Sequence, residues 1–180
     1  MAYKQILKRL VTPATFILIG VIARIIPHAP NFTPIGAMAL FGGAYMDKKQ
    51  ALILPVLAMI LSDFIIGFDS LPMRLTVYGS FLIMVLIGFW LKRHNKFGNI
   101  LTASLVSSLL FFATTNFAVW AFGTMYLKTF AGLGESYLFA IPFFRNTVLG
   151  DLFYSGAFFG SYELAKHFLQ NKHFRLNLNR

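Results

Sequence analysis

Apolar residues in this chain gather in six runs, separated by short segments that are polar or contain glycine and proline. The runs cover residues 13–26, 35–46, 51–67, 75–91, 100–125 and 138–168. They have the length of helices and lack the alternation over about ten residues that marks a membrane β-strand. The pattern therefore predicts an all-α bundle of six transmembrane helices in a single domain.

Two of the six runs depart from an ordinary span. The second run is short for a bilayer and rich in glycine and alanine, which permits close contact between helices. The sixth run is longer than a bilayer requires and contains Pro142, followed by Arg145, Asn146 and Asp151. We expect a kink or an outward extension near Pro142, because proline interrupts the hydrogen bonds of a helix interior.

Composition places the chain in a membrane. Of its 180 residues, 57% are hydrophobic and 12% are charged, and the mean hydropathy is +0.68. Soluble domains are about 45–50% apolar and about a quarter charged. The net charge of +10 does not indicate nucleic-acid binding, because the basic residues cluster at the ends of the runs. The absence of cysteine excludes disulfides, thiolate metal ligands and thiol catalysis.

Lysine and arginine are distributed unevenly between the two sides of the predicted bundle. With six spans, four of them fall on or toward one side: Arg24, Arg74, Lys128 and Arg145. The other side carries Lys4, Lys8, Arg9, Lys48, Lys49, Lys92, Arg93, Lys96, Lys166, Lys172, Arg175 and Arg180. The basic side of a membrane protein faces the cytoplasm, so we expect both termini inside. The N-terminus has a basic start and an apolar run but no small-residue cleavage site followed by a polar chain, so we expect the first helix to be retained and not cleaved as a signal peptide.

Polar and unusual residues gather on the opposite, outer side. They are His28, Asn31, Asp63, Asp69, Arg74, Asn116, Trp120, Tyr126, Arg145 and Asn146. The inner side has basic anchors and little else. This asymmetry predicts a pocket that opens to the outside.

Two acidic residues lie within apolar runs, where insertion of an ionised group costs about 2.5–3.5 kcal/mol and usually signals a partner or a function. Asp63 has two interpretations, a ligand or ion contact and a structural ion pair with Arg24 or Arg145. Asp151 is either functional or a polar contact that joins helices. The sequence leaves these alternatives open.

The remaining polar candidates lie near the outer ends of the fifth and sixth runs. Arg145, beside Asn146, could clamp a carboxylate or phosphate, or extend to the lipid headgroups. Asn116 and Trp120 are four residues apart on one helix face and offer a hydrogen bond and a stacking surface. Trp120 is also typical of an interfacial aromatic belt.

His28 is the single histidine expected on the outer side. It could stabilise its loop, contact a ligand or, with carboxylates from other helices, bind a metal, although one histidine is a poor basis for a metal site. We expect no metal and no cofactor. The chain has no G-x-S-x-G, H-E-x-x-H or P-loop motif, so we expect no enzyme and no ATPase within it.

Two small-x-x-x-small patterns occur, Ala39-x-x-x-Gly43 in the second run and Gly156-x-x-x-Gly160 in the sixth. Such patterns let helix backbones approach closely. They are explained either by packing within the bundle or by docking of another membrane helix.

Residues 26–68, IPHAPNFTPIGAMALFGGAYMDKKQALILPVLAMILSDFIIGF, resemble the N-terminal half of the substrate-binding S components of energy-coupling factor (ECF) transporters. The shared features are a first loop with proline and asparagine, a helix of small residues, a short basic turn and a third helix ending in a polar pair and glycine. Over most of its length the chain is also similar to a branch of bacterial membrane proteins of that fold. The motifs of that branch are PHxPNFTP, ALFGGAY, SD, TNFAVW and PFFRNTxxGD.

The resemblance implies a protein of the bacterial cytoplasmic membrane with a ligand pocket in its outer half, covered by the first loop. It implies uptake of a small vitamin-like solute together with a coupling membrane subunit and two ATPases. By position, the pocket residues would be His28, Asn31, Asp63, Asn116, Trp120 and Arg145. The chain lacks the Met-His start of the cobalt and nickel members, and its first helix has no clear alanine-x-x-x-alanine docking pattern.

Two other functions stay open on the sequence alone. One is a membrane enzyme acting on an amphiphilic substrate with Asp63 or Asp151 and His28. The other is a structural or assembly protein that docks through its glycine-containing helix faces.

Overall fold

The computed structural model describes residues 12–178, with side chains over 12–170. The basic segment expected at residues 3–10, and the side chains of Lys172, Arg175 and Arg180, lie outside this part of the chain. Within it the structure is entirely helical and contains no strand, so the expected all-helical architecture is confirmed there.

Seven helices follow one another along the described residues. They are α2 (Pro13–Ile25), α3 (Ile35–Tyr45), α4 (Lys48–Ile66), α5 (Leu71–Leu91), α6 (Phe97–Phe122), α7 (Phe130–Leu138) and α8 (Ile141–Leu178). Three of them, α4, α5 and α6, are long and apolar enough to cross a membrane, whereas α2 and α3 are apolar but shorter. These helices identify the chain as membrane-associated.

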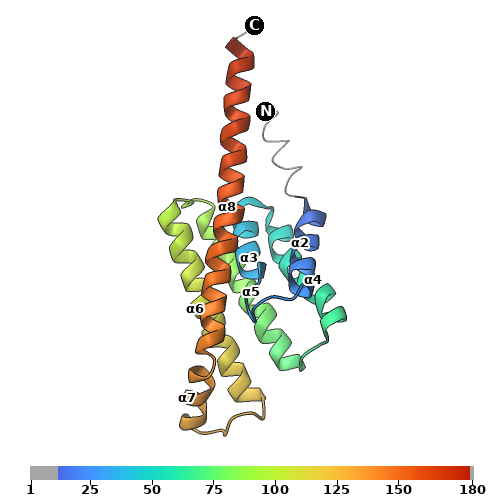
Figure 1. Cartoon of the computed structure of the whole chain (residues 1–180), viewed down its shortest axis with the longest axis vertical. Coiled ribbons are helices and arrows are strands. Elements are labelled where there is room, and N and C mark those ends of the chain that lie inside the picture. The colour runs from blue at the N-terminus through green and yellow to red at the C-terminus, as the bar shows by residue number, and fades with distance from the viewer. Residues whose placement is uncertain (1–11, 179–180) are drawn as a thin grey trace.

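The long helices run side by side, and their connections alternate between the two ends of the bundle (Figure 1). The α4–α5 and α6–α7 connections lie at one end. The α5–α6 connection lies at the other, from which α8 projects (Figure 1). Because α2 and α3 are shorter than α4 to α6, the α2–α3 connection stays within the depth of the longer helices (Figure 1).

Helix α3 is the centre of the bundle. All residues from Ile35 to Ala44 are buried, and the helix packs against α4, α5, α6 and α8. Its backbone meets that of α5 at two glycines: a Cβ added to Gly43 would lie 2.4 Å from the Val85 carbonyl oxygen, and one added to Gly88 would lie 2.4 Å from that of Leu40. Gly43 therefore serves packing within the bundle, one of the two explanations offered for its pattern.

The C-terminal part differs from the expectation at Pro142. Residues 126–137, expected as a loop, contain α7, whose N-terminus is capped by the Thr129 side chain accepting from the Gly132 amide. Helix α8 begins at Ile141, so Pro142 lies in its first turn, where proline costs no hydrogen bond and causes no kink.

Tyr137 of α7 donates a 2.7 Å hydrogen bond to the Ala113 carbonyl of α6, and burial raises the pKa of its phenol.

The second small-residue pattern faces away from the bundle. Gly156 and Gly160 are exposed, and a Cβ added to either would meet nothing within 4 Å. Packing within the bundle therefore does not explain this pair.

Candidate functional site

A cavity of about 270 Å³ lies among α2, α3, α4, α5, α6, α8 and the two connections α2–α3 and α4–α5. Its polar lining residues are Arg24, Asn31, Thr33, Asp63, Asp69, Arg74, Tyr78, Thr147 and Asp151. Its apolar lining residues include Met59, Val77, Phe81, Met84 and Phe111. A cavity with an apolar wall and a few converging charged groups has the composition of a small-molecule site.

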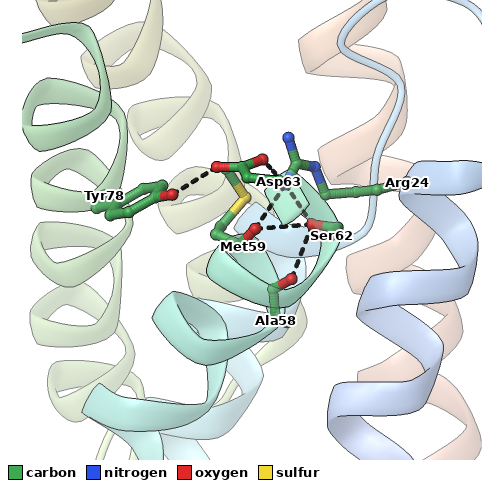
Figure 2. Close-up of polar contacts among 6 residues, drawn as sticks. All are labelled: Arg24, Ala58, Met59, Ser62, Asp63 and Tyr78. Carbon is green, nitrogen blue, oxygen red and sulfur yellow. Dashed lines mark hydrogen bonds and ion pairs between the residues drawn. The ribbon is translucent and has the colours of Figure 1, made fainter. Parts of the chain in front are cut away.

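One wall of the cavity is an ion pair between two helices. Arg24 of α2 donates through Nη1 to Oδ1 of Asp63 on α4 at 2.7 Å, and Tyr78 of α5 donates to Oδ2 at 2.5 Å (Figure 2). Of the two partners considered for Asp63, the structure has Arg24. Both carboxylate oxygens are satisfied, and the pair is largely buried, with side-chain exposures of 17% for Arg24 and 8% for Asp63.

The residues just before Asp63 hold the guanidinium in place. Arg24 Nη1 also donates to the Ser62 hydroxyl and, at 3.2 Å, to the Met59 carbonyl (Figure 2). Ser62 in turn donates to the carbonyls one helical turn earlier, including that of Ala58 at 2.8 Å. Consecutive Ser62 and Asp63 near the end of α4 thus give one arginine several acceptors.

The opposite wall carries a second buried carboxylate. Asp151 of α8 is 4% exposed and accepts a 2.7 Å hydrogen bond from the Ser108 hydroxyl of α6 at Oδ2. Its other oxygen lies against α3, where a Cβ added to Gly36 would stand 2.3 Å from it. Only glycine at position 36 leaves room for this carboxylate.

Arg74, which the sequence placed among the polar residues of the outer side but not among the expected pocket residues, also lines the cavity. The carbon of its guanidinium lies 4.9 Å above the centre of the Phe68 ring, a cation–π contact. Its Nε atom is buried without a hydrogen-bond partner, and no carboxylate of the described residues lies within ion-pair distance. The spacing of Arg74, Tyr78 and Phe81 on one face of an apolar helix is the signal that could have found it.

The expected site residues divide into two groups. Asn31 and Asp63, expected in the pocket, line the cavity, and so do Arg24 and Asp151, which were expected as ion-pair or structural residues. Five others do not and are corrections to the expected pocket: His28, Asn116, Trp120, Arg145 and Asn146.

Asn116 and Trp120 instead make hydrogen bonds at the end of α6 that leads into α7. The Asn116 amide donates to the Phe112 carbonyl of its own helix at 2.8 Å. Trp120 donates through its indole nitrogen to the Leu127 carbonyl at 2.9 Å, and Lys128 donates to the Trp120 carbonyl. The Trp120 and Lys128 bonds hold the α6–α7 connection against the end of α6, and neither Asn116 nor Trp120 lines the cavity.

Asn146 fastens the α2–α3 connection to α8. Its amide donates to the Pro30 carbonyl at 3.0 Å, beside Asn31, which has a φ of 64°. Asparagine tolerates this left-handed conformation better than most residues. Arg145 is exposed: Thr147 and Asp151 are four apart and face the cavity, so Arg145, two positions before Thr147, points to the other side of the helix.

His28 is exposed and turned toward its own loop. Its Nδ1 lies 2.6 Å from the Ile26 carbonyl oxygen. Within the described part of the chain, no three His, Cys, Asp or Glu side chains are grouped so that they could hold a metal ion. His28 does not line the cavity that Asp63 and Asp151 share.

These features place the chain in a structural class, the membrane-associated helical bundles, with a cavity between its helices that is lined by charged side chains. The chain belongs to a family of unknown function, DUF6580, whose model matches residues 4–173. Comparisons with curated proteins and with solved structures found no match.

Proposed function

We propose that this protein is a multi-pass membrane protein that binds a small, vitamin-like solute in the cavity and takes part in its uptake. The observation that carries this proposal is Arg74, a cation on the cavity wall whose Nε is buried without a hydrogen-bond partner. A buried donor left unsatisfied costs about 1–3 kcal/mol, a cost that a bound solute with a suitable acceptor would remove.

The size and lining of the cavity support a small solute. Its volume of about 270 Å³ is close to the lower end of the range for ligand pockets, about 300–1,000 Å³. Phe81, Met84 and Phe111 supply apolar surface, and Tyr78 and Thr147 supply hydroxyls. A compact molecule with a polar end fits this combination.

The proposed orientation follows from the charges. In a six-span arrangement, α2, α3, α4, α5, α6 and α8 would cross the bacterial cytoplasmic membrane. The α3–α4 and α5–α6 connections, with Lys48, Lys49, Lys92 and Lys96, would then face the cytoplasm with both termini. The cavity, which is lined by the α4–α5 connection, would be reached from outside, and α7 would lie at the outer surface.

The binding proposal is tested with purified protein and cells. We expect at least one compound from a broad panel of vitamins and related metabolites to raise the melting temperature (Tm) of the purified protein, because a ligand that binds only the folded state stabilises it. Arg74→Ala should remove this stabilisation and the uptake of the same compound. Arg145→Ala, which alters an exposed arginine outside the cavity, is the matched control and should change neither.

One combination of results would contradict the proposed uptake function. If no compound raises the Tm, and cells producing Arg74→Ala and Asp63→Ala take up solutes like the wild type, the cavity does not serve uptake.

A second candidate, assembly with a partner membrane protein, is favoured by the exposed glycines of α8. Gly156 and Gly160 have no neighbour within the bundle, so another helix could approach their backbone closely. An ECF-type coupling subunit with ATPases is the partner we propose, since the chain has no P-loop of its own. Gly156→Leu should abolish co-purification with such a subunit. Gly134→Leu, which alters another glycine with open space around it, is the control and should keep it. This pair of results would support the docking face. Co-purification that survives Gly156→Leu would exclude it.

A further inference from the structure

The charged groups of the cavity are not all paired. Arg24 and Asp63 satisfy each other at 2.7 Å. Asp69 lies at the α4–α5 connection and is exposed, so water solvates its charge. Arg74 and Asp151 remain as the two groups of opposite sign for which the described residues offer no ion-pair partner.

These two groups come from different sides of the cavity. Arg74 is near the start of α5, above the Phe68 ring, with its Nε buried and unbonded. Asp151 is on α8, 4% exposed, between Ser108 of α6 and the backbone of α3 at Gly36. The cavity thus presents a cation from α5 and a carboxyl group from α8.

We propose that the solute is a small zwitterion, whose anionic group is bound by Arg74 and whose protonated amine is bound by Asp151. This inference rests on the proposed binding function and narrows its substrate class. Arg74 would contribute a planar set of donors suited to a carboxylate or phosphate. Asp151, already bonded to Ser108, would use its remaining oxygen for the amine.

Ligands with a single charge satisfy only half of this arrangement. A simple anion would bind Arg74 but would leave Asp151 in the cavity without a counter-charge. A simple amine would bind Asp151 but would leave the Nε of Arg74 unbonded. Leaving one buried charge without its partner is far more costly than satisfying both, so the two ends together favour a zwitterion.

The test uses a series of unbranched ω-amino acids from β-alanine to 8-aminooctanoate. Each is compared with the carboxylic acid and the primary amine of the same chain length. Binding to the purified protein is measured by calorimetry and by the shift in Tm. We expect at least one ω-amino acid to bind about tenfold or more tightly than both of its singly charged counterparts. The series also measures the separation of the two groups, because the chain length that binds best must span it.

Two variants of similar side-chain size test which residue binds each charged end of the ω-amino acid. Arg74→Gln should reduce the affinity for that ω-amino acid to the level of the matched amine, and Asp151→Asn to the level of the matched acid. Asparagine retains an oxygen that accepts from Ser108, so the packing of α8 should survive, and an unchanged Tm without ligand verifies it. Arg145→Gln, at an exposed arginine outside the cavity, should bind like the wild type.

Three results would overturn the zwitterion proposal. In the first, no ω-amino acid binds more tightly than the acid and the amine of the same chain length. In the second, Arg74→Gln and Asp151→Asn leave the preference for the ω-amino acid unchanged. In the third, a neutral or singly charged vitamin binds in a way that requires Arg74, while no zwitterion binds. In the third case the proposed binding function stands and only the substrate class is wrong. If nothing from either panel binds, both proposals fail.

Discussion

Arg24 and Asp63 join the ends of α2 and α4 through a 2.7 Å ion pair beside the cavity. Arg24 lies in the last turn of α2, where a cation also interacts favourably with the helix dipole. The pair is therefore both a wall of the cavity and a connection between two helices.

Asp63→Asn should destabilise the protein, because it leaves Arg24 largely buried without its counter-charge. Removal of one partner of a buried pair costs about 3 kcal/mol, which for a chain of this size lowers the Tm by about 6–12 °C. The double variant Arg24→Gln with Asp63→Asn should be less destabilised than the sum of the two single variants. Thermal denaturation of the purified proteins measures all four; additive single effects would show that the pair contributes nothing.

Gly88→Ala should disrupt the contact between α3 and α5. The added Cβ would lie 2.4 Å from the Leu40 carbonyl oxygen, which forces the helices apart. Overpacking of this kind costs about 1–3 kcal/mol, or a fall in Tm of about 2–12 °C. Gly79→Ala is the matched control on the same helix, with nothing within 4 Å of its new Cβ. It should be neutral or stabilising by about 1 kcal/mol, since alanine favours helix. Equal stability of the two variants would contradict the close approach.

Position 31 should tolerate glycine and reject β-branched residues. Asn31 has a φ of 64°, a conformation that costs an ordinary L-residue about 1–2 kcal/mol and glycine nothing. Asn31→Gly should therefore keep the wild-type Tm, and Asn31→Val should lower it by about 2–8 °C. A Val variant as stable as the Gly variant would show that the loop does not hold this backbone conformation.

The six-span orientation makes a labelling prediction. The chain has no cysteine, so any introduced thiol is unique. Asn95→Cys, exposed in the α5–α6 connection, should react with a membrane-impermeant maleimide only after the cells are lysed. Thr124→Cys, exposed in the α6–α7 connection, should react in intact cells. The opposite pattern would show that the protein has the reverse orientation. Equal reactivity at both positions in intact cells would show that no membrane lies between them.

The helices could be predicted from sequence because apolar runs report them directly. The second run, short and rich in small residues, predicted a helix at 35–46, and α3 spans Ile35–Tyr45. Helix α7 could not be found in this way, because Phe130–Leu138 mixes glycines, a glutamate and apolar residues. Its formation depends on the Thr129 cap and on packing against α6.

The candidate site was predicted in part. Asp63, Asp151 and Arg24 stand out because charge within an apolar run is costly and therefore visible in the sequence. Asn116 and Asn146 were equally visible, but their hydrogen bonds go to the Phe112 and Pro30 carbonyls, a choice that depends on tertiary structure. A polar residue in an apolar segment predicts that it has a partner, but not whether that partner is a ligand or the backbone.

Arg74 shows the opposite limitation. In sequence it is one basic residue at the outer end of a run, where an arginine can extend to the lipid headgroups. Its importance arises from α5 packing beside α4, which brings Phe68 under the guanidinium and leaves Nε buried. The spacing of Arg74, Tyr78 and Phe81 places them on one helix face, but it does not encode the contact with Phe68 or the burial of Nε.

Helix α8 contributes Thr147 and Asp151 to the cavity wall and then continues without interruption to Leu178, well beyond the other helices (Figure 1). If the cavity binds a solute as proposed, a helix that starts at its wall and extends this far acts as a lever. Any tilt that a captured molecule imposes at Asp151 is amplified at Gln170, about 28 Å further along the axis. A fluorescent or spin probe attached at Gln170 would therefore report whether the cavity is occupied without contacting the bound molecule.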